Sequence, residues 1–106
     1  MAALASCAYP PSERPRYPEL ADNLPLGFAE ADAEFKRRVN AAFPLPIRVD
    51  DLAERLTQQG FFVDRGAQQA RFAVTRFPCQ LRWLVGWNET GGDVSRLLPV
   101  FGRACL

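Results

Sequence analysis

The sequence predicts an α+β fold, with two N-terminal helices packed on one face of a three- or four-stranded antiparallel meander. Apolar residues recur every three or four positions as far as Gly60 and alternate with polar ones after it. The helical segments precede the strand-like ones, with no strand–helix alternation, which favours a sheet with segregated helices. A chain of 106 residues leaves room for one domain.

Residues 27–43 are predicted to form the first helix. Acidic residues come early and basic ones later, as suits the helix dipole. Pro44 and Pro46 should end the helix. The apolar residues repeat at spacings near three, four and seven and so share one face: Phe28, Phe35, Val39, Ala42 and Phe43.

The second predicted helix, "VDDLAERLTQQG", covers residues 49–60. Asp51, with Glu54 three residues later, gives a start like a capping box, and Asp50 is an alternative cap. Gly60 is placed to end the helix in a left-handed conformation. The apolar stripe is narrow: Leu52, Ala53 and Leu56.

Four strand-like segments follow, at residues 61–65, 69–77, 79–87 and 94–106. The third has the clearest alternation, and its Trp83 and Trp87 share a face with Leu81 and Val85. We expect that face to be the core; on a solvated face the two indoles would be partner anchors. The glycines of "NETGGD" predict a hairpin turn, and Pro99 argues for an edge or a break in the last strand.

Two of the three cysteines lie in this C-terminal region. In a hairpin turning at residues 89–92, position 79 falls opposite about position 102, so a slip or bulge near Pro99 would bring Cys105 beside Cys79. In an oxidising compartment we expect this pair to form a disulfide, closing about 27 residues and stabilising the fold by about 3 kcal/mol. The alternative is two free thiols, with Cys79 as a small core residue.

Residues 1–26 are predicted to be a truncated export signal and a proline-rich tether, leaving residues 27–106 as the α+β domain. Within the first part, "LASC" ends at Cys7 and matches a lipobox, in which the cysteine is acylated. The charged and apolar regions of a signal peptide are absent before it, so we expect the true start upstream or a trimmed chain. The alternative is a chance match in an alanine-rich N-terminus.

Residues 27–106 resemble small bacterial envelope lipoproteins. The matching residues are "WLVGW" at 83–87, the two glycines at 91 and 92, and "CL" at 105 and 106. The element order is also similar to the SmpA/OmlA (BamE-like) lipoprotein fold. The resemblance implies a periplasm-facing interaction module without a catalytic site. Ala8 follows Cys7, where inner-membrane lipoproteins of enteric bacteria carry aspartate, which favours the outer membrane.

The composition of the chain argues against several classes of function. The net charge of +1 gives no general attraction to nucleic acid, and no apolar run is long enough to span a bilayer. Without histidine, and with no zinc spacing among the cysteines, we predict no metal, no cofactor and no catalytic residues. Carboxylates that could serve an enzyme have simpler roles as caps or turn residues: Asp50, Asp51, Glu54, Glu89 and Asp93.

The sequence therefore predicts a non-catalytic, lipid-anchored envelope protein that acts as an interaction or structural module. Its partner would be an unidentified envelope protein, with no small-molecule substrate inferred. Arg71, Arg82 and Arg96 could form an anionic contact on the open face of the sheet, or could be merely solvated. The alternative is a cytosolic accessory domain with free thiols; a small carboxylate-dependent enzyme is a less favoured reading.

Overall fold

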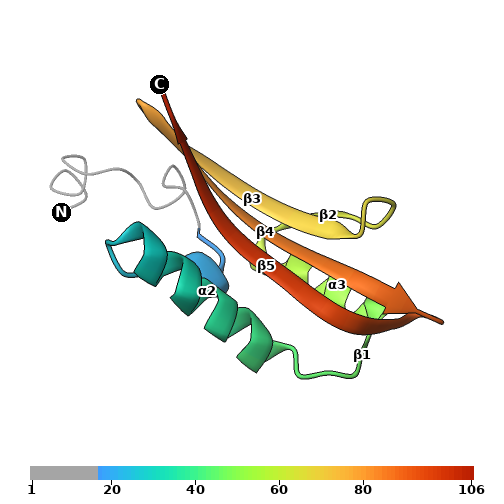
Figure 1. Ribbon diagram of the computed structural model, residues 1–106. Helices are drawn as coiled ribbons and strands as arrows, with labels where there is room; N and C mark the ends of the chain where they lie inside the picture. The colour runs from blue at the N-terminus through green and yellow to red at the C-terminus, as the bar shows by residue number, and fades with distance from the viewer. Residues whose placement is uncertain (1–16) are drawn as a thin grey trace, which may run out of the picture.

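The computed structural model describes residues 17–106 and confirms the α+β class. Cys7 and the remainder of residues 1–16 lie outside the described part. Figure 1 shows the chain from its N-terminal side in blue to the C-terminal strand in red. The elements, in chain order, are the 3₁₀ turn η2 (Glu19–Ala21), α2 (Phe28–Ala42), β1 (Ile47–Arg48), α3 (Val49–Gln59), β2 (Phe62–Asp64), β3 (Gln69–Arg76), β4 (Cys79–Thr90) and β5 (Asp93–Cys105).

The sheet has five strands in the order β1-β5-β4-β3-β2, so the predicted three- or four-stranded meander after two consecutive helices is wrong. The unforeseen strand is β1, which lies between the helices; its Ile47 pairs antiparallel with Val94. Two residues are too few to show a periodicity in the sequence. Pro44 and Pro46, which end the first helix, also favour an extended chain in front of β1.

The sheet is also curled into a half-barrel and is not a flat layer beneath the helices (Figure 1). Strands β4 and β5 are 12 and 13 residues long. Because the right-handed twist accumulates along long strands, such a sheet coils around whatever it packs against. Helix α2 lies against β5, and α3 lies against β1 and β2, both on the concave inner face.

The inner face and the helices share one apolar core. Trp83 and Trp87 are 3% and 2% exposed, so the prediction that they face the core is confirmed. Phe72 of β3 is the cross-strand partner of Trp83 and so lies on the same face of the sheet. The helices contribute Ala31, Phe35 and Val39 from α2 and Val49, Leu52 and Leu56 from α3.

The C-terminal end of α3 was predicted correctly, but the cap at its N-terminal end was not. Gly60 ends the helix at φ +103°, as predicted. The capping residue was predicted to be Asp51 or Asp50, but the residue before the helix is Arg48, and no side chain caps it. Both aspartates lie in the first turn, where their charges still suit the positive end of the helix dipole.

The packed part of the chain begins before the boundary predicted at residue 27. Leu20 and Ala21 of η2 are buried in the core, and the ring of Tyr17 meets that of Trp83 edge-on at 5.7 Å between centroids. The Arg38 Nη1 atom of α2 donates to the carbonyl oxygen of Asp22 at 2.5 Å. Contacts from the core and from α2 therefore fix residues 17–24 against the domain.

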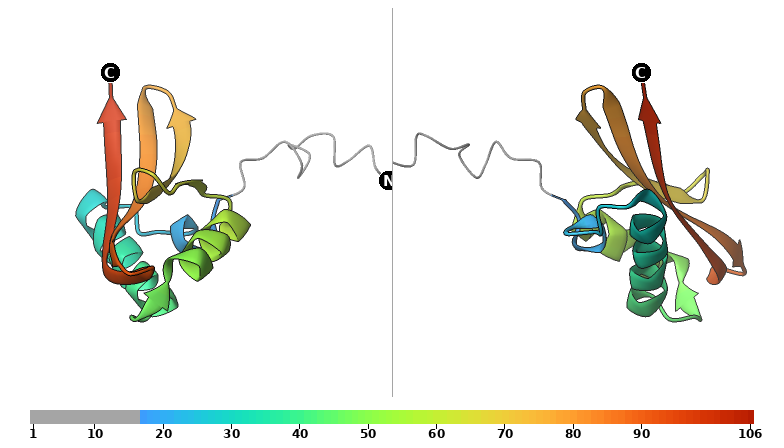
Figure 2. Two further views of the ribbon diagram at one scale, coloured as in Figure 1. Left: turned by 90° about the vertical axis from the view of Figure 1, so that its right-hand side faces the viewer. Right: turned by 60° about the vertical axis from the view of Figure 1, so that its left-hand side comes forward.

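One end of strands β3, β4 and β5 extends beyond both helices, as Figure 2 shows. We call residues 74–81 and 103–106 the projecting end. On its inner side Val74 and Leu81 are only half-buried, and Arg76 and Arg103 are exposed. No helix within residues 17–106 covers this end, in contrast to the rest of the inner face.

Candidate interaction surface

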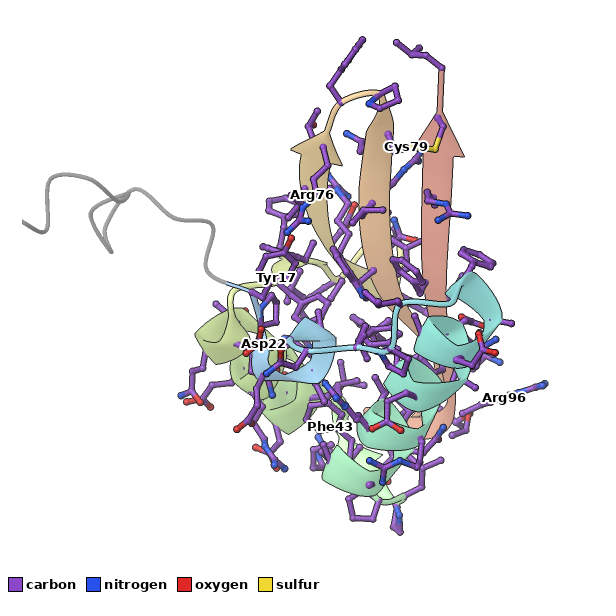
Figure 3. All side chains as sticks on the ribbon, turned by 90° about the vertical axis from the view of Figure 1, so that its left-hand side faces the viewer. Tyr17, Asp22, Phe43, Arg76, Cys79 and Arg96 are labelled. Carbon is purple, nitrogen blue, oxygen red and sulfur yellow. A yellow bond between two sulfur atoms is a disulfide. The ribbon has the colours of Figure 1, made fainter. Side chains whose placement is uncertain are left out.

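Cys79 and Cys105 meet at the projecting end (Figure 3). They are cross-strand partners, and their sulfur atoms lie 2.02 Å apart, at disulfide distance. The predicted pairing of these two cysteines is therefore confirmed in position. Beside them, the Leu106 N–H donates to the Pro78 carbonyl at 2.9 Å, so the ladder continues past the sulfurs.

The register that pairs β4 with β5 has a different origin from the one predicted. The hairpin turns on Gly91 and Gly92, whose φ values of +60° and +83° suit a tight two-residue turn. The irregularity in the ladder lies between Asn88 and Glu89, near the turn, and not near Pro99. The shorter turn and this bulge together shift Cys105 opposite Cys79.

The three arginines predicted for the open face come from three strands: Arg71 from β3, Arg82 from β4 and Arg96 from β5. Arg82 pairs with Ala73, next to the pair of Arg71 with Leu84. Each has at least one neighbour in sequence that points into the core, so these side chains point outward, and all three are exposed. Figure 3 shows Arg96 pointing away from the side that carries Tyr17 and Arg76.

Apolar side chains lie among these arginines. Phe62, Leu98 and Val100 are 59%, 39% and 45% exposed. Phe62, Arg71, Leu84 and Val100 form one cross-strand row over β2, β3, β4 and β5. The Arg71 guanidinium lies 4.6 Å above the Phe62 ring, a cation–π contact. We call this surface the outer face; its members are Phe62, Arg71, Arg82, Leu84, Arg96, Leu98 and Val100.

The outer face has the chemistry of a protein-binding surface. Within residues 17–106, neither helix covers it, and no carboxylate lies within ion-pair distance of its three guanidiniums. Arginine is enriched in binding hot spots, and the buried centres of protein interfaces are apolar. The arrangement therefore fits a partner surface that is apolar at its centre and acidic at its rim.

The arginines of the outer face were predicted from the sequence, but the apolar residues between them were not. The signal was present as a break in alternation: Leu97 and Leu98 are adjacent, and so are Phe61 and Phe62. One member of each pair is buried in the core, so the other must point outward. Two adjacent apolar residues in a strand can therefore mark a sheet whose second face is also partly apolar.

The carboxylates considered for catalysis have structural partners in several cases. Asp50 pairs with Arg65 at 2.8 Å, and Glu89 accepts a hydrogen bond from the Trp87 Nε1 atom at 2.9 Å. Asp51 and Glu54 line an open depression of about 460 Å³ beside α3. Asp93 pairs with Arg48 at 3.1 Å. Within residues 17–106, no group of three or more Cys, Asp or Glu side chains could hold a metal ion.

Two carboxylates of α2 have shifted pKa values. Hydrogen bonds from Arg37 and Arg38 lower the pKa of Glu34 to about 2. Burial acts to raise the pKa of Asp32, but hydrogen bonds from the Lys36 side chain and the Phe101 N–H outweigh it and lower the pKa below its ordinary value. The Asp32 contact joins α2 to the free edge of β5, so its role is structural.

Comparison of the chain with protein-family models, curated proteins and solved structures found no match. In the part of the chain from Tyr17 onward, no helix is both long and apolar enough to cross a membrane.

Proposed function

We propose that this protein is a non-catalytic interaction module of the bacterial cell envelope. In this proposal it faces the periplasm, is anchored by a lipid on Cys7, with the outer membrane favoured, and binds a protein partner through the outer face. The observation that carries the binding function is the apolar centre of Phe62, Leu98 and Val100, left uncovered by the described residues and bordered by three arginines.

The cysteine arrangement supports the compartment. Disulfides persist mainly in oxidising compartments, and the Cys79–Cys105 pair lies at disulfide distance. Pairing these two cysteines leaves Cys7 as the odd one, and an odd cysteine in an exported protein needs another fate. Acylation is the fate that the "LASC" stretch predicts, in keeping with the resemblance to envelope lipoproteins.

The binding function can be tested by site-specific photo-crosslinking in cells that produce the protein from its own locus. A photo-reactive residue at Val100 should give one defined adduct, whereas the same residue at Ala41, which is exposed on α2, should not. Combining Val100 labelling with Arg71→Gln, Arg82→Gln and Arg96→Gln should abolish the adduct, because the acidic rim of the partner loses its contacts. Equal adducts from both positions, or an adduct that survives the triple change, would contradict the proposed surface.

Anchoring needs a separate test. Cells grown with radiolabelled palmitate should label the natural protein, and Cys7→Ser should abolish the label and release the protein from the membrane fraction. Palmitate label retained by Cys7→Ser would contradict acylation at Cys7, and natural protein found without label in the cytosol would favour the cytosolic accessory domain instead.

A further inference from the structure

A groove of about 330 Å³ lies on the inner side of the sheet, between the projecting end and the loop that leads into α2. Its apolar lining combines aliphatic residues with four aromatic ones. Trp83 and Phe101 are stacked with their ring centroids 5.1 Å apart, and the Phe28 ring lies 5.5 Å from that of Phe101. Tyr17, Leu24 and Leu81 also line the groove. The groove is on the opposite side of the sheet from the outer face.

Two guanidiniums border the groove from different strands. The Arg76 Nη2 atom of β3 donates to the Tyr17 hydroxyl at 3.1 Å, and Arg103 of β5 lies 5.4 Å from the Phe28 ring centroid. Within residues 17–106, no carboxylate lies within 4.0 Å of either guanidinium. The lining includes one acidic residue, Asp22, on the loop side, so it carries two positive charges and one negative. Figure 3 shows Tyr17, Asp22 and Arg76 along this side of the molecule.

The indole nitrogen of Trp83 has no hydrogen-bond partner among the described residues. This Nε1 donor is buried, whereas that of Trp87 is satisfied by Glu89. Leaving a buried donor unpaired costs about 1–3 kcal/mol, so native proteins rarely do so. Trp83 lines the groove, but this nitrogen is itself buried and is not exposed to a ligand there.

We propose that this groove binds an amphipathic carboxylate, a molecule with one negative head group and an apolar body. The body would lie on Trp83, Phe101 and Phe28, and the head group would lie between Arg76 and Arg103. The aromatic lining supplies apolar contact area, and guanidiniums without ion-pair partners pair well with carboxylates. The volume is at the lower end of the range for small-molecule sites, which favours a ligand of modest length.

The test uses decanoate as the probe and Trp83 as the reporter. In the full chain, Trp87→Phe leaves Trp83 as the sole tryptophan. Decanoate should change the Trp83 emission saturably, and calorimetry on the unaltered protein should give the same affinity. 1-Decanol, used below its solubility limit, has the same chain without the charge and should bind at least tenfold more weakly.

Variants locate the site. Arg76→Gln combined with Arg103→Gln should weaken decanoate binding at least tenfold, while Arg96→Gln on the outer face should leave it unchanged. Both arginines of the groove are exposed, so the double variant should keep its thermal midpoint, which shows that it is folded. No saturable binding to the full chain, equal binding of decanol, or undiminished binding by the double variant would overturn the proposal. Because the outer face is not involved, any of these results leaves the proposed protein-binding function standing.

Discussion

The two ends of the sheet are stabilised in different ways. At the covered end, the inner-face residues Val85 and Val94 are almost completely buried under the helices. At the projecting end, Leu81 is half-buried, while Phe77 at the hairpin tip is 83% exposed. Burial of apolar surface accounts for the first end, whereas the second depends on ladder hydrogen bonds and on the Cys79–Cys105 pair. The cysteine pair, at disulfide distance, thus lies where the helices do not reach, and the groove is open because no helix of residues 17–106 covers this end.

The largest expected effect is at the covered end. Trp87→Ala should lower the free energy of unfolding by about 3–5 kcal/mol, because it leaves a cavity in a closed core. Phe77→Ala removes an aromatic ring at the projecting end and should change it by less than about 0.5 kcal/mol. Urea denaturation of both variants measures the contrast. Comparable losses would mean that the two ends do not differ in burial.

Removing the link should act next most strongly, and mainly at the projecting end. Cys79→Ala with Cys105→Ala should cost about 2–4 kcal/mol in a protein whose natural form is oxidised. Hydrogen exchange should show lost amide protection at residues 74–81 and 103–105, with protection kept at Val85 and in α2. Uniform loss over the whole sheet would indicate that the link stabilises both ends equally.

The contact of α2 with the sheet edge should have a smaller effect. The Asp32 Oδ1 atom accepts a hydrogen bond from the Phe101 N–H at 2.9 Å, where the covered end gives way to the projecting end. Asp32→Ala should lower the free energy of unfolding by about 1 kcal/mol, because the edge N–H loses its charged acceptor. Asp22→Ala, an exposed aspartate on the loop, is the matched control and should change it by less than about 0.5 kcal/mol.

Acid should destabilise the protein by protonating two carboxylates of α2, Glu34 and Asp32. The pKa of Glu34 is lowered from 4.5 to about 2, and that of Asp32 is also lowered, so the unfolded chain takes up protons first. Their stabilisation is present above the unfolded pKa values and is lost as pH falls through the folded ones. Melting temperatures should therefore fall between about pH 5 and pH 2. Glu34→Gln should flatten this slope slightly, since exposed ion pairs contribute little; an unchanged slope would contradict the assignment.

The buried face of the sheet could be predicted from the sequence, whereas its shortest strand and its curl could not. Where a face is buried under helices, periodicity alone was sufficient, as with Trp83 and Trp87 in β4. Strand β1 has only two residues and forms through its pairing with Val94, so no local pattern could reveal it. The curl of the sheet is likewise a property of long paired strands and not of any single residue.

The candidate sites were predicted less completely. The pairing of Cys79 with Cys105 could be foreseen from the hairpin, but the bulge between Asn88 and Glu89 could not. The outer arginines followed from alternation. The groove was missed because Arg76 and Arg103 lie 27 positions apart in the chain and are brought to one hollow only by the register of three strands.

The central claim is that the projecting end is closed by a disulfide in a protein matured outside the reducing cytoplasm. The most direct test is peptide mass spectrometry on protein from its native cells, alkylated before lysis and never reduced. We expect tryptic fragments 77–82 and 104–106 to be joined through Cys79 and Cys105, and Cys7 to be acylated and not alkylated. Alkyl groups on all three cysteines would contradict it.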